Sequence, residues 1–345
     1  MTGSERARPV RGRVTIRDVA RTAGVSVTTV SHALNGKGQI RPETREHIRG
    51  VATRLGYRPS RAAQALRRSR TGTIALILPS VGSHAEEREM ISLDYYMSIA
   101  SAAAQGAFGH GYSLVLPPRL TTADEWRVLA PDGVLLCDPA AGDERIDALE
   151  GLGVPVVSIE RDSGRPERPF YVAGDNVANM RVMLDHLDGA GAQRIALLWA
   201  ESSWAWTLDS RSAYERWCAE RGRDPIVTPV SLHDLESDAY RASAQLLDRP
   251  DRPDAVVASA EKYAEGVLRA CRDRGLGVPG DVMVVSGIDN HELQRSVPAV
   301  SAIDLDPAAQ ALAAIEMLHA RLEGDDVTEP RIVPSELHVR QSTRR

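Results

Sequence analysis

Residues 15–35, TIRDVARTAGVSVTTVSHALN, decide how the first part of the chain folds. Apolar residues recur in the first half of this stretch at the spacing of one helix face: Ile16, Val19, Ala20 and Ala23. Thr15 with Asp18 three residues later has the form of a capping box, which predicts that a helix begins at Ile16. Gly24 ends that helix, and Ser26 is a favoured N-cap for a second one.

The second predicted helix has two different faces. Val30, Ala33 and Leu34 share an apolar face. Small polar side chains repeat on the opposite face: Thr28, Ser31, His32 and Asn35. Such a helix packs on its neighbour with one side and presents hydrogen-bonding groups on the other, as in a helix-turn-helix unit whose second helix enters the DNA major groove. The alternative, two ordinary helices of a globular core, leaves the polar face without a purpose.

The residues that follow complete a small helical domain. Pro42 suits the first position of a third helix, and Gly56 ends it. The pattern therefore predicts a DNA-binding domain over residues 15–58, preceded by a flexible basic arm at residues 1–14. Residues 59–72 are predicted to form a hinge helix and a linker. A helix this short is marginal in isolation, so it orders only when something packs on it.

Charge is distributed unevenly along the 345 residues. Residues 1–70 hold 16 Arg and Lys against 4 Asp and Glu, a net charge of +12. The remaining residues hold 26 basic and 43 acidic side chains, a net charge of −17. A basic head on an acidic body indicates that only the head meets a polyanion.

From Thr73 onward, apolar runs of strand length alternate with helical segments, which predicts a parallel α/β architecture. Three segments recur at offsets of 121, 122 and 124 residues, and together they indicate two lobes built alike. They are 73–78 with 194–199, 131–134 with 253–256, and GLGVP at 151–155 with the same letters at 275–279. We expect an N-lobe at about 73–173 and 302–332, a C-lobe at about 174–301 and 333–345, and a ligand cleft between them.

Cysteine usage and hydropathy bear on where the protein works. Cys137, Cys218 and Cys271 lie far apart without CxxC spacing, which predicts buried free thiols in a reducing cytoplasm instead of a disulfide or metal framework. No apolar run approaches the ~18 residues that span a bilayer, and the N-terminus has no apolar signal-peptide core. We expect a cytoplasmic, nucleoid-associated protein without a membrane partner.

Two other classes of protein fit parts of the sequence. An enzyme is suggested by Gly275-x-Gly277-x-x-Gly280, but this dinucleotide-like pattern precedes a strand instead of a helix and contains Pro279. The sequence has no GxSxG, HExxH or Walker pattern, so we predict neither enzymatic activity nor a cofactor. A cytoplasmic sugar-binding protein without a DNA-binding role would suit the lobes but leaves the basic head unexplained.

With these pieces in place, the chain resembles the LacI/GalR family of bacterial transcription regulators over nearly its whole length. The resemblance is carried by residues 15–35, RPETR at 41–45, LGY at 55–57, residues 58–66, and lobe motifs such as GIDN at 287–290. It implies an all-α helix-turn-helix headpiece plus hinge helix, joined to a two-lobed core with parallel sheets like that of periplasmic binding proteins.

The resemblance also implies a function. We expect a homodimeric repressor that binds a near-palindromic operator in double-stranded DNA and responds to a small-molecule effector, a sugar or sugar derivative, in the cleft. The sequence leaves open whether the effector is an inducer or a co-repressor.

The same resemblance assigns DNA contacts to single residues. Val27, Thr28 and His32 fall at positions that read base edges, while Leu66, with Ala63 one turn earlier, falls where the family inserts a leucine into the minor groove. Backbone contacts are assigned to Ser26, Thr29, Ser31, Asn35, Thr44 and Tyr57. Ser26 serves equally well as an N-cap alone, and the alternative for His32 is a solvated helix face.

Effector contacts are implied for seven residues of the lobes. They are Tyr95, Tyr96, Trp204, Trp206, Arg211, Glu261 and Asp289. Opposed charges hold polar ligands by charge-assisted hydrogen bonds, and aromatic faces suit sugars or purines. For each aromatic residue, packing in the core or between the lobes is an equal alternative. Residues 79–93 resemble an insertion relative to the family.

Overall fold

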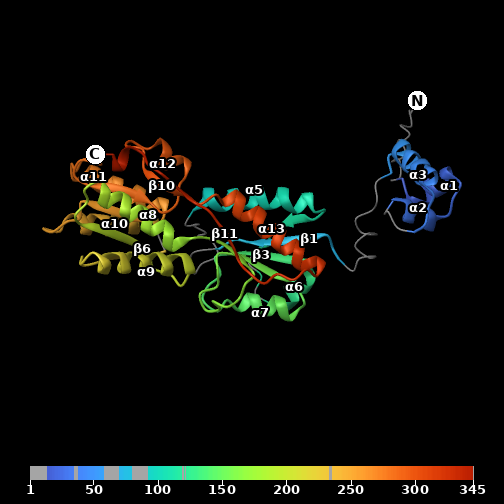
Figure 1. Ribbon diagram of the computed structural model, residues 1–345, viewed down its shortest axis with the longest axis horizontal. Helices are drawn as coiled ribbons and strands as arrows, with labels where there is room; N and C mark the ends of the chain where they lie inside the picture. Colours follow the sequence, from blue (N-terminus) through green and yellow to red (C-terminus); the bar gives the residue numbers. More distant parts are fainter. Residues whose placement is uncertain are drawn as a thin grey trace, which may run out of the picture. The chain divides into compact units, whose positions relative to one another are not determined.

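The computed structural model describes residues 14–34, 38–57, 70–79, 92–118, 120, 122–232 and 235–344. It divides the chain into two units, Met1–Thr71 and Gly72–Arg345 (Figure 1). The basic arm, Asn35, the hinge helix with Ala63 and Leu66, and the middle of the insertion lie outside the described residues.

The first unit contains three helices, α1 (Ile16–Ala23), α2 (Val27–Leu34) and α3 (Pro42–Leu55). The capping box is present at α1, because Thr15 and Asp18 each accept from the other's backbone N–H. Gly24 and Gly56 end α1 and α3 with φ of 68° and 66°, a left-handed conformation that favours glycine. The helix boundaries predicted from the sequence are therefore confirmed.

The three helices enclose a small apolar core. Its buried members come from all three helices: Val19, Ala20, Val30, Ala33, Ile48, Val51 and Ala52. Burying a valine or isoleucine side chain contributes about 1.5–3 kcal/mol. Since Val30 and Ala33 fill this core, the opposite face of α2 is directed away from it.

The second unit contains two parallel sheets of six strands each (Figure 1). The first has the order β11-β5-β4-β3-β1-β2, and the second has the order β12-β10-β9-β8-β6-β7. The strands of the first sheet are β1 (Thr73–Ile77), β2 (Ser113–Val115), β3 (Gly133–Cys137), β4 (Val156–Ile159), β5 (Tyr171–Gly174) and β11 (Arg331–Val333). The strands of the second are β6 (Ile195–Ala200), β7 (Ile226–Val230), β8 (Ala255–Ala258), β9 (Met283–Ser286), β10 (Ser301–Asp304) and β12 (Glu336–His338), which alone in this sheet runs antiparallel to its neighbour.

Helices cover both faces of the first sheet. One face packs on α5 (Leu93–Gly109) and α13 (Pro307–Glu323), and the other on α6 (Ala123–Leu129) and α7 (Glu144–Gly151) (Figure 1). Alternate strand residues point to opposite faces, so Ile74 and Leu76 join the first cluster while Ala75 joins the second. This is the layered arrangement that parallel sheets require.

The second sheet is covered in the same way. The helices α8 (Asn176–Gly189) and α9 (Ala205–Glu220) cover one face, and α10 (Leu235–Leu247) and α11 (Glu261–Asp273) cover the other. A short helix, α12 (His291–Arg295), and a 3-10 turn, η1 (Gln341–Thr343), complete the lobe. The two lobes share one strand order, which explains the internal repeat of the sequence.

The chain crosses between the lobes three times, after β5, after β10 and after β11. The second crossing follows Asp304, a few residues later than the boundary expected at 301/302, because β10 pairs with β9 in the second sheet. Since α13 then packs on α5 and on strands of the first sheet, each lobe is assembled from separate stretches of the chain.

Candidate functional site

Two regions are candidates for binding, the outer face of α2 and a pocket between the lobes. Each contains some of the residues predicted from the sequence. On α2, Val27, Thr28 and His32 are all exposed, with 42% of Val27 accessible. The structure thus brings the three predicted base-reading residues onto one open helix face. Whether they meet DNA stays a prediction.

Residues predicted to hold the DNA backbone have local roles in the fold as well. Ser26 caps α2, because its Oγ accepts from the backbone N–H of Thr29 at 3.0 Å and lies 2.8 Å from the Thr29 hydroxyl. Ser31, Thr44 and Tyr57 are half-buried at the rim of the headpiece core. Capping and phosphate contact are compatible, since a backbone N–H at a helix start also attracts anions.

His32 is seated against the chain that follows α2. A Cβ atom at Gly38 would lie 2.9 Å from Nδ1 of His32, and Gly38 has a φ of 73°. The left-handed conformation favours glycine at position 38, whereas the exposed imidazole could move away from a Cβ atom.

The pocket lies between the lobes and has an empty volume of about 580 Å³. The first lobe contributes Tyr95, Tyr96, Asp138 and Glu160. The remaining lining residues are Asn176, Asn179, Met180, Met183, Trp206, Ser210, Ser259, Gly287, Ile288 and Leu305.

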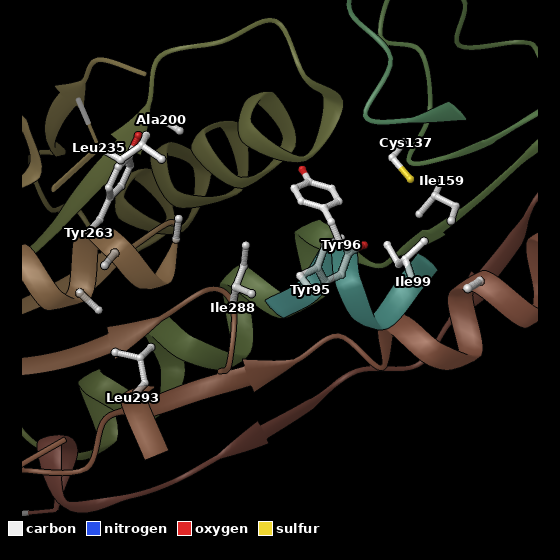
Figure 2. Close-up of a cluster of buried hydrophobic side chains, with 14 of the residues drawn as sticks. Tyr95, Tyr96, Ile99, Cys137, Ile159, Ala200, Leu235, Tyr263, Ile288 and Leu293 are labelled. Atoms are coloured by element: carbon white, nitrogen blue, oxygen red, sulfur yellow. The ribbon is translucent and has the colours of Figure 1, made fainter. Parts of the chain in front are cut away.

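Tyr95 and Tyr96 form the aromatic floor at the start of α5. Their ring centroids are 5.2 Å apart in an edge-to-face arrangement, and Figure 2 shows them between Ile288 and the pair Cys137 and Ile159. Tyr95 donates to Oε1 of Gln310 at 2.7 Å, and Tyr96 donates to Oδ2 of Asp138 at 2.5 Å. The two hydroxyls are thus held by the protein.

Asp138 and Glu160 follow β3 and β4 directly, at the carboxyl ends of neighbouring parallel strands. Both have a positive φ, 44° for Asp138 and 71° for Glu160, a conformation that non-glycine residues rarely adopt. Such strain gathers at binding sites, where the surrounding structure holds it in place. Here it turns two carboxylates toward the same pocket.

Burial changes the ionisation of both acids. It raises the pKa of Asp138 to about 7, although hydrogen bonds from Tyr96 and Trp206 act in the opposite direction. It raises the pKa of Glu160 to about 8, and the nearby charge of Asp138 adds to this, while Asn176 donates to Oε2 of Glu160 at 3.0 Å and opposes it. A carboxyl in a desolvated site near a second carboxyl binds its proton more tightly.

Of the seven predicted effector contacts, Tyr95, Tyr96 and Trp206 line the pocket. Trp204 does not line it but stacks on Trp206, with ring centroids 6.2 Å apart. Glu261 is buried at the start of α11, outside the lining.

The two predicted residues of opposite charge also lie outside the lining, because each has a protein partner. Arg211 pairs with Glu215 one turn later, at 2.8 Å, and its guanidinium lies over the ring of Trp199. Asp289 accepts two hydrogen bonds from Arg340, at 2.9 and 2.5 Å. The residue that faces the pocket beside Arg211 is Ser210.

The sequence analysis missed Asp138 and Glu160. The available signal was an acidic residue immediately after each of two fully apolar runs, GVLLC at 133–137 and VVSI at 156–159. Carboxyl ends of parallel strands meet at one edge of a sheet, where ligands of such folds bind. Position in the strand pattern therefore pointed to these residues.

Contacts join the two lobes beside the pocket. Ser163 donates to the backbone carbonyl of Ser203 at 2.8 Å, and Arg161 pairs with Asp209 at 2.5 Å. Ser163 and Arg161 follow β4, whereas Ser203 lies just before α9 and Asp209 lies within α9. The loop after β4 therefore connects the pocket of one lobe to a helix of the other.

Other kinds of site find no support in the described part of the chain. No group of three or more His, Cys, Asp or Glu in that part is placed to hold a metal ion. No helix among the same residues is long and apolar enough to cross a bilayer. Cys137, Cys218 and Cys271 are buried and free, as predicted.

A headpiece of three helices with an exposed recognition face, attached to a two-lobed core with a pocket, defines the class of DNA-binding transcriptional regulators. The model of bacterial regulatory proteins of the lacI family matches residues 15–60, and that of the periplasmic binding protein-like domain matches residues 184–343. The HTH-type transcriptional regulator AglR of Rhizobium meliloti (strain 1021) is 30% identical over 344 residues, covering 96% of this chain and 94% of the relative. The chain belongs to the lacI family.

Other comparisons agree. The HTH-type transcriptional regulator CelR of Thermobifida fusca is 30% identical over 341 residues, covering 96% of this chain and 99% of the relative. A solved CelR–cellobiose complex has a TM-score of 0.70 at 26% identity, covering 96% of this chain and all of that one. The lac repressor dimer bound to operator and the anti-inducer ONPF has a TM-score of 0.78 at 22% identity, covering 96% and 99%, and supports the fold. These relatives are named as regulators and not as enzymes.

Proposed function

We propose that this protein is a transcriptional repressor that binds a near-palindromic operator as a homodimer and is controlled by a sugar or sugar derivative in the pocket between its lobes. The observation that carries the proposal is the outward face of α2, where Thr28 and His32 are exposed while Val30 fills the core. A helix arranged in this way can enter a major groove without unpacking the headpiece. The place of action is the nucleoid.

The contacts divide into three groups. Val27, Thr28 and His32 read base edges, with Val27 suited to a thymine methyl. The backbone is held by Ser26, Thr29, Ser31, Asn35, Thr44 and Tyr57. In the predicted hinge helix and linker of residues 59–72, Leu66 with Ala63 enters the minor groove, where an apolar wedge kinks the duplex.

The effector acts because both lobes supply the walls of its pocket. A ligand that contacts Tyr95 and Glu160 on one lobe and Asn176 and Trp206 on the other stabilises one relative orientation of the lobes. It shifts the protein between two states only by its difference in affinity for them. A sugar is supported because CelR was solved with cellobiose. Operator binding by a dimer is supported because a lac repressor dimer was solved on its operator.

The direct test starts with selection of binding sites from random duplexes by the full-length protein. We expect a site with two related half-sites, bound about 10³-fold or more tightly than a scrambled duplex. Failure to enrich any duplex would refute the proposed function. Fluorescence anisotropy on the selected site then measures the effect of variants and of sugars.

Two variants sharpen the assignment. Leu66→Ala is expected to weaken operator binding while effector binding is retained, and unchanged operator affinity would discard the wedge. His32→Ala is expected to relax base preference at one position of each half-site by about 1–3 kcal/mol. His47→Ala on α3, which changes an exposed histidine outside α2, is the matched control. A loss from His32→Ala that is uniform over all sequences would instead identify a phosphate contact.

A further inference from the structure

The charge of the pocket has one sign. Asp138 and Glu160 are acidic, and the described residues that line the pocket include no arginine, lysine or histidine. The other polar lining groups are neutral amides and hydroxyls, such as Asn176 and Ser259. A phosphorylated or carboxylated ligand would meet two carboxylates and no cation, so the lining disfavours anions.

Arginines next to the lining residues are engaged elsewhere. Arg161 follows Glu160 but pairs with Asp209 at 2.5 Å. Arg211 follows Ser210 but pairs with Glu215 and lies over Trp199. Neither guanidinium neutralises the pocket acids by a hydrogen bond, because both are directed to their own carboxylate partners.

The donors that reach the two acids are themselves neutral. Asp138 accepts from the hydroxyl of Tyr96 and the indole of Trp206, and Glu160 accepts from the amide of Asn176 and the backbone of Gly174. A buried carboxylate without a positive partner is costly, and it is compensated by protonation or by a cation. A ligand that brings a positive charge would therefore gain where a neutral one would not.

The remaining walls suit a sugar ring. Trp206 and Tyr95 offer aromatic surface, which packs on the apolar face of a ring and attracts cations. Asn179 and Ser210 offer donors and acceptors for hydroxyl groups.

We propose that the effector is an amino sugar, whose protonated amine pairs with Asp138 and Glu160. This inference rests on the proposed function, because it names the ligand of the same pocket. It differs from a neutral sugar such as the cellobiose found with CelR, since the amine is recognised by charge.

The inference carries a pH dependence. Other titratable groups lie around the two acids. Burial and then Asp138 raise the pKa values of Tyr95, Tyr96 and Cys137 well above their usual values, and burial raises the pKa of Tyr171. Asp209 and Arg161 are paired with each other. Between pH 5.5 and 7, ionisation in the pocket is therefore confined to Asp138 and Glu160. Amine binding should strengthen over this interval because the carboxyls must lose protons to pair with it.

The test is calorimetric titration of the full-length protein at pH 7 with three disaccharides of one β-1,4-linked skeleton. They are the glucosamine disaccharide, cellobiose, and N,N′-diacetylchitobiose, which carry amines, hydroxyls and amides in turn. We expect the amine to bind at least 10-fold more tightly than either neutral compound. Equal or weaker binding of the amine, including the absence of binding by all three, would overturn the inference.

Variants identify the charged partners. Glu160→Gln and Asp138→Asn should each bring the affinity ratio of amine to cellobiose close to 1, and the retained cellobiose binding shows that each variant is folded. Asp94→Asn, which removes an exposed carboxyl of α5 outside the lining, is the control and should keep the ratio. A preference for the amine that survives in both pocket variants refutes the assignment. Selection of operator duplexes is a separate readout, so failure of this inference is distinguishable from failure of the proposed function.

Discussion

Replacing Asp138 by Asn should change how the stability of the core depends on pH. Asp138 is 5% exposed, and burial raises its pKa to about 7, whereas an unfolded aspartate titrates near 3.9. Between these values the folded carboxyl keeps a proton that the unfolded one has released. The free energy of unfolding therefore falls as pH rises through this interval.

The magnitude follows from the size of the interval. Each pH unit corresponds to about 1.36 kcal/mol, so the two units from pH 5 to the raised pKa correspond to about 3 kcal/mol. Asp138→Asn has no such proton to lose. Its stability relative to the wild type should be about 3 kcal/mol more favourable at pH 8 than at pH 5, and the pKa of Glu160 should fall because a neighbouring charge is gone.

Urea unfolding followed by tryptophan fluorescence measures this difference. All five tryptophans lie at positions 126 to 217, so the signal reports the core without the headpiece. Asp94→Asn, which changes an exposed carboxyl on α5, is the control and should leave the pH dependence unchanged. If Asp138→Asn alters stability equally at pH 5 and pH 8, Asp138 is not a buried acid that loses its proton in this range, and the reasoning fails.

Three other changes have expected outcomes. Gly266→Ala should destabilise the core by about 1–3 kcal/mol in urea, because its Cβ would lie 2.9 Å from the backbone of α10, while Gly189→Ala meets nothing within 4 Å and should be nearly neutral. A double-mutant cycle on Arg161 and Asp209 should give a coupling of about 0.2–1 kcal/mol, since both side chains are 25% exposed, and a value of zero would show that the contact does not hold the lobes. Val30→Ala should cost the headpiece about 2 kcal/mol and weaken operator binding without changing tryptophan fluorescence, and unchanged affinity would contradict its place in the headpiece core.

The fold was predictable because its signals are local or repeated. Short stretches of sequence show the capping box at Thr15 and the glycines that end α1 and α3. They also show the three segments that recur at nearly the same offset. The position of the second crossing between the lobes was harder to predict from the sequence. Its position depends on which sheet accepts β10, and strand pairing is not visible in the apolar pattern of a single strand.

The pocket was predictable only in part, because the direction of a side chain depends on its competing partners. The aromatic pair Tyr95 and Tyr96 lies in the pocket as the resemblance implied. Arg211 and Asp289 match family positions, but Glu215 and Arg340 bind them outside the pocket lining. Such pairing arises from the tertiary structure, so the family motif alone could not exclude it.

The triple passage of the chain between the lobes has a consequence for synthesis. The sixth strand of the first sheet, β11, ends at Val333, and the antiparallel edge of the second sheet, β12, ends at His338. Neither half can therefore reach its final form until the residues of β11 and β12 have been synthesised. A message that stops before β11 would leave β5 and β10 as exposed sheet edges, which are prone to aggregation. Loss of this single stretch would thus damage both lobes at once.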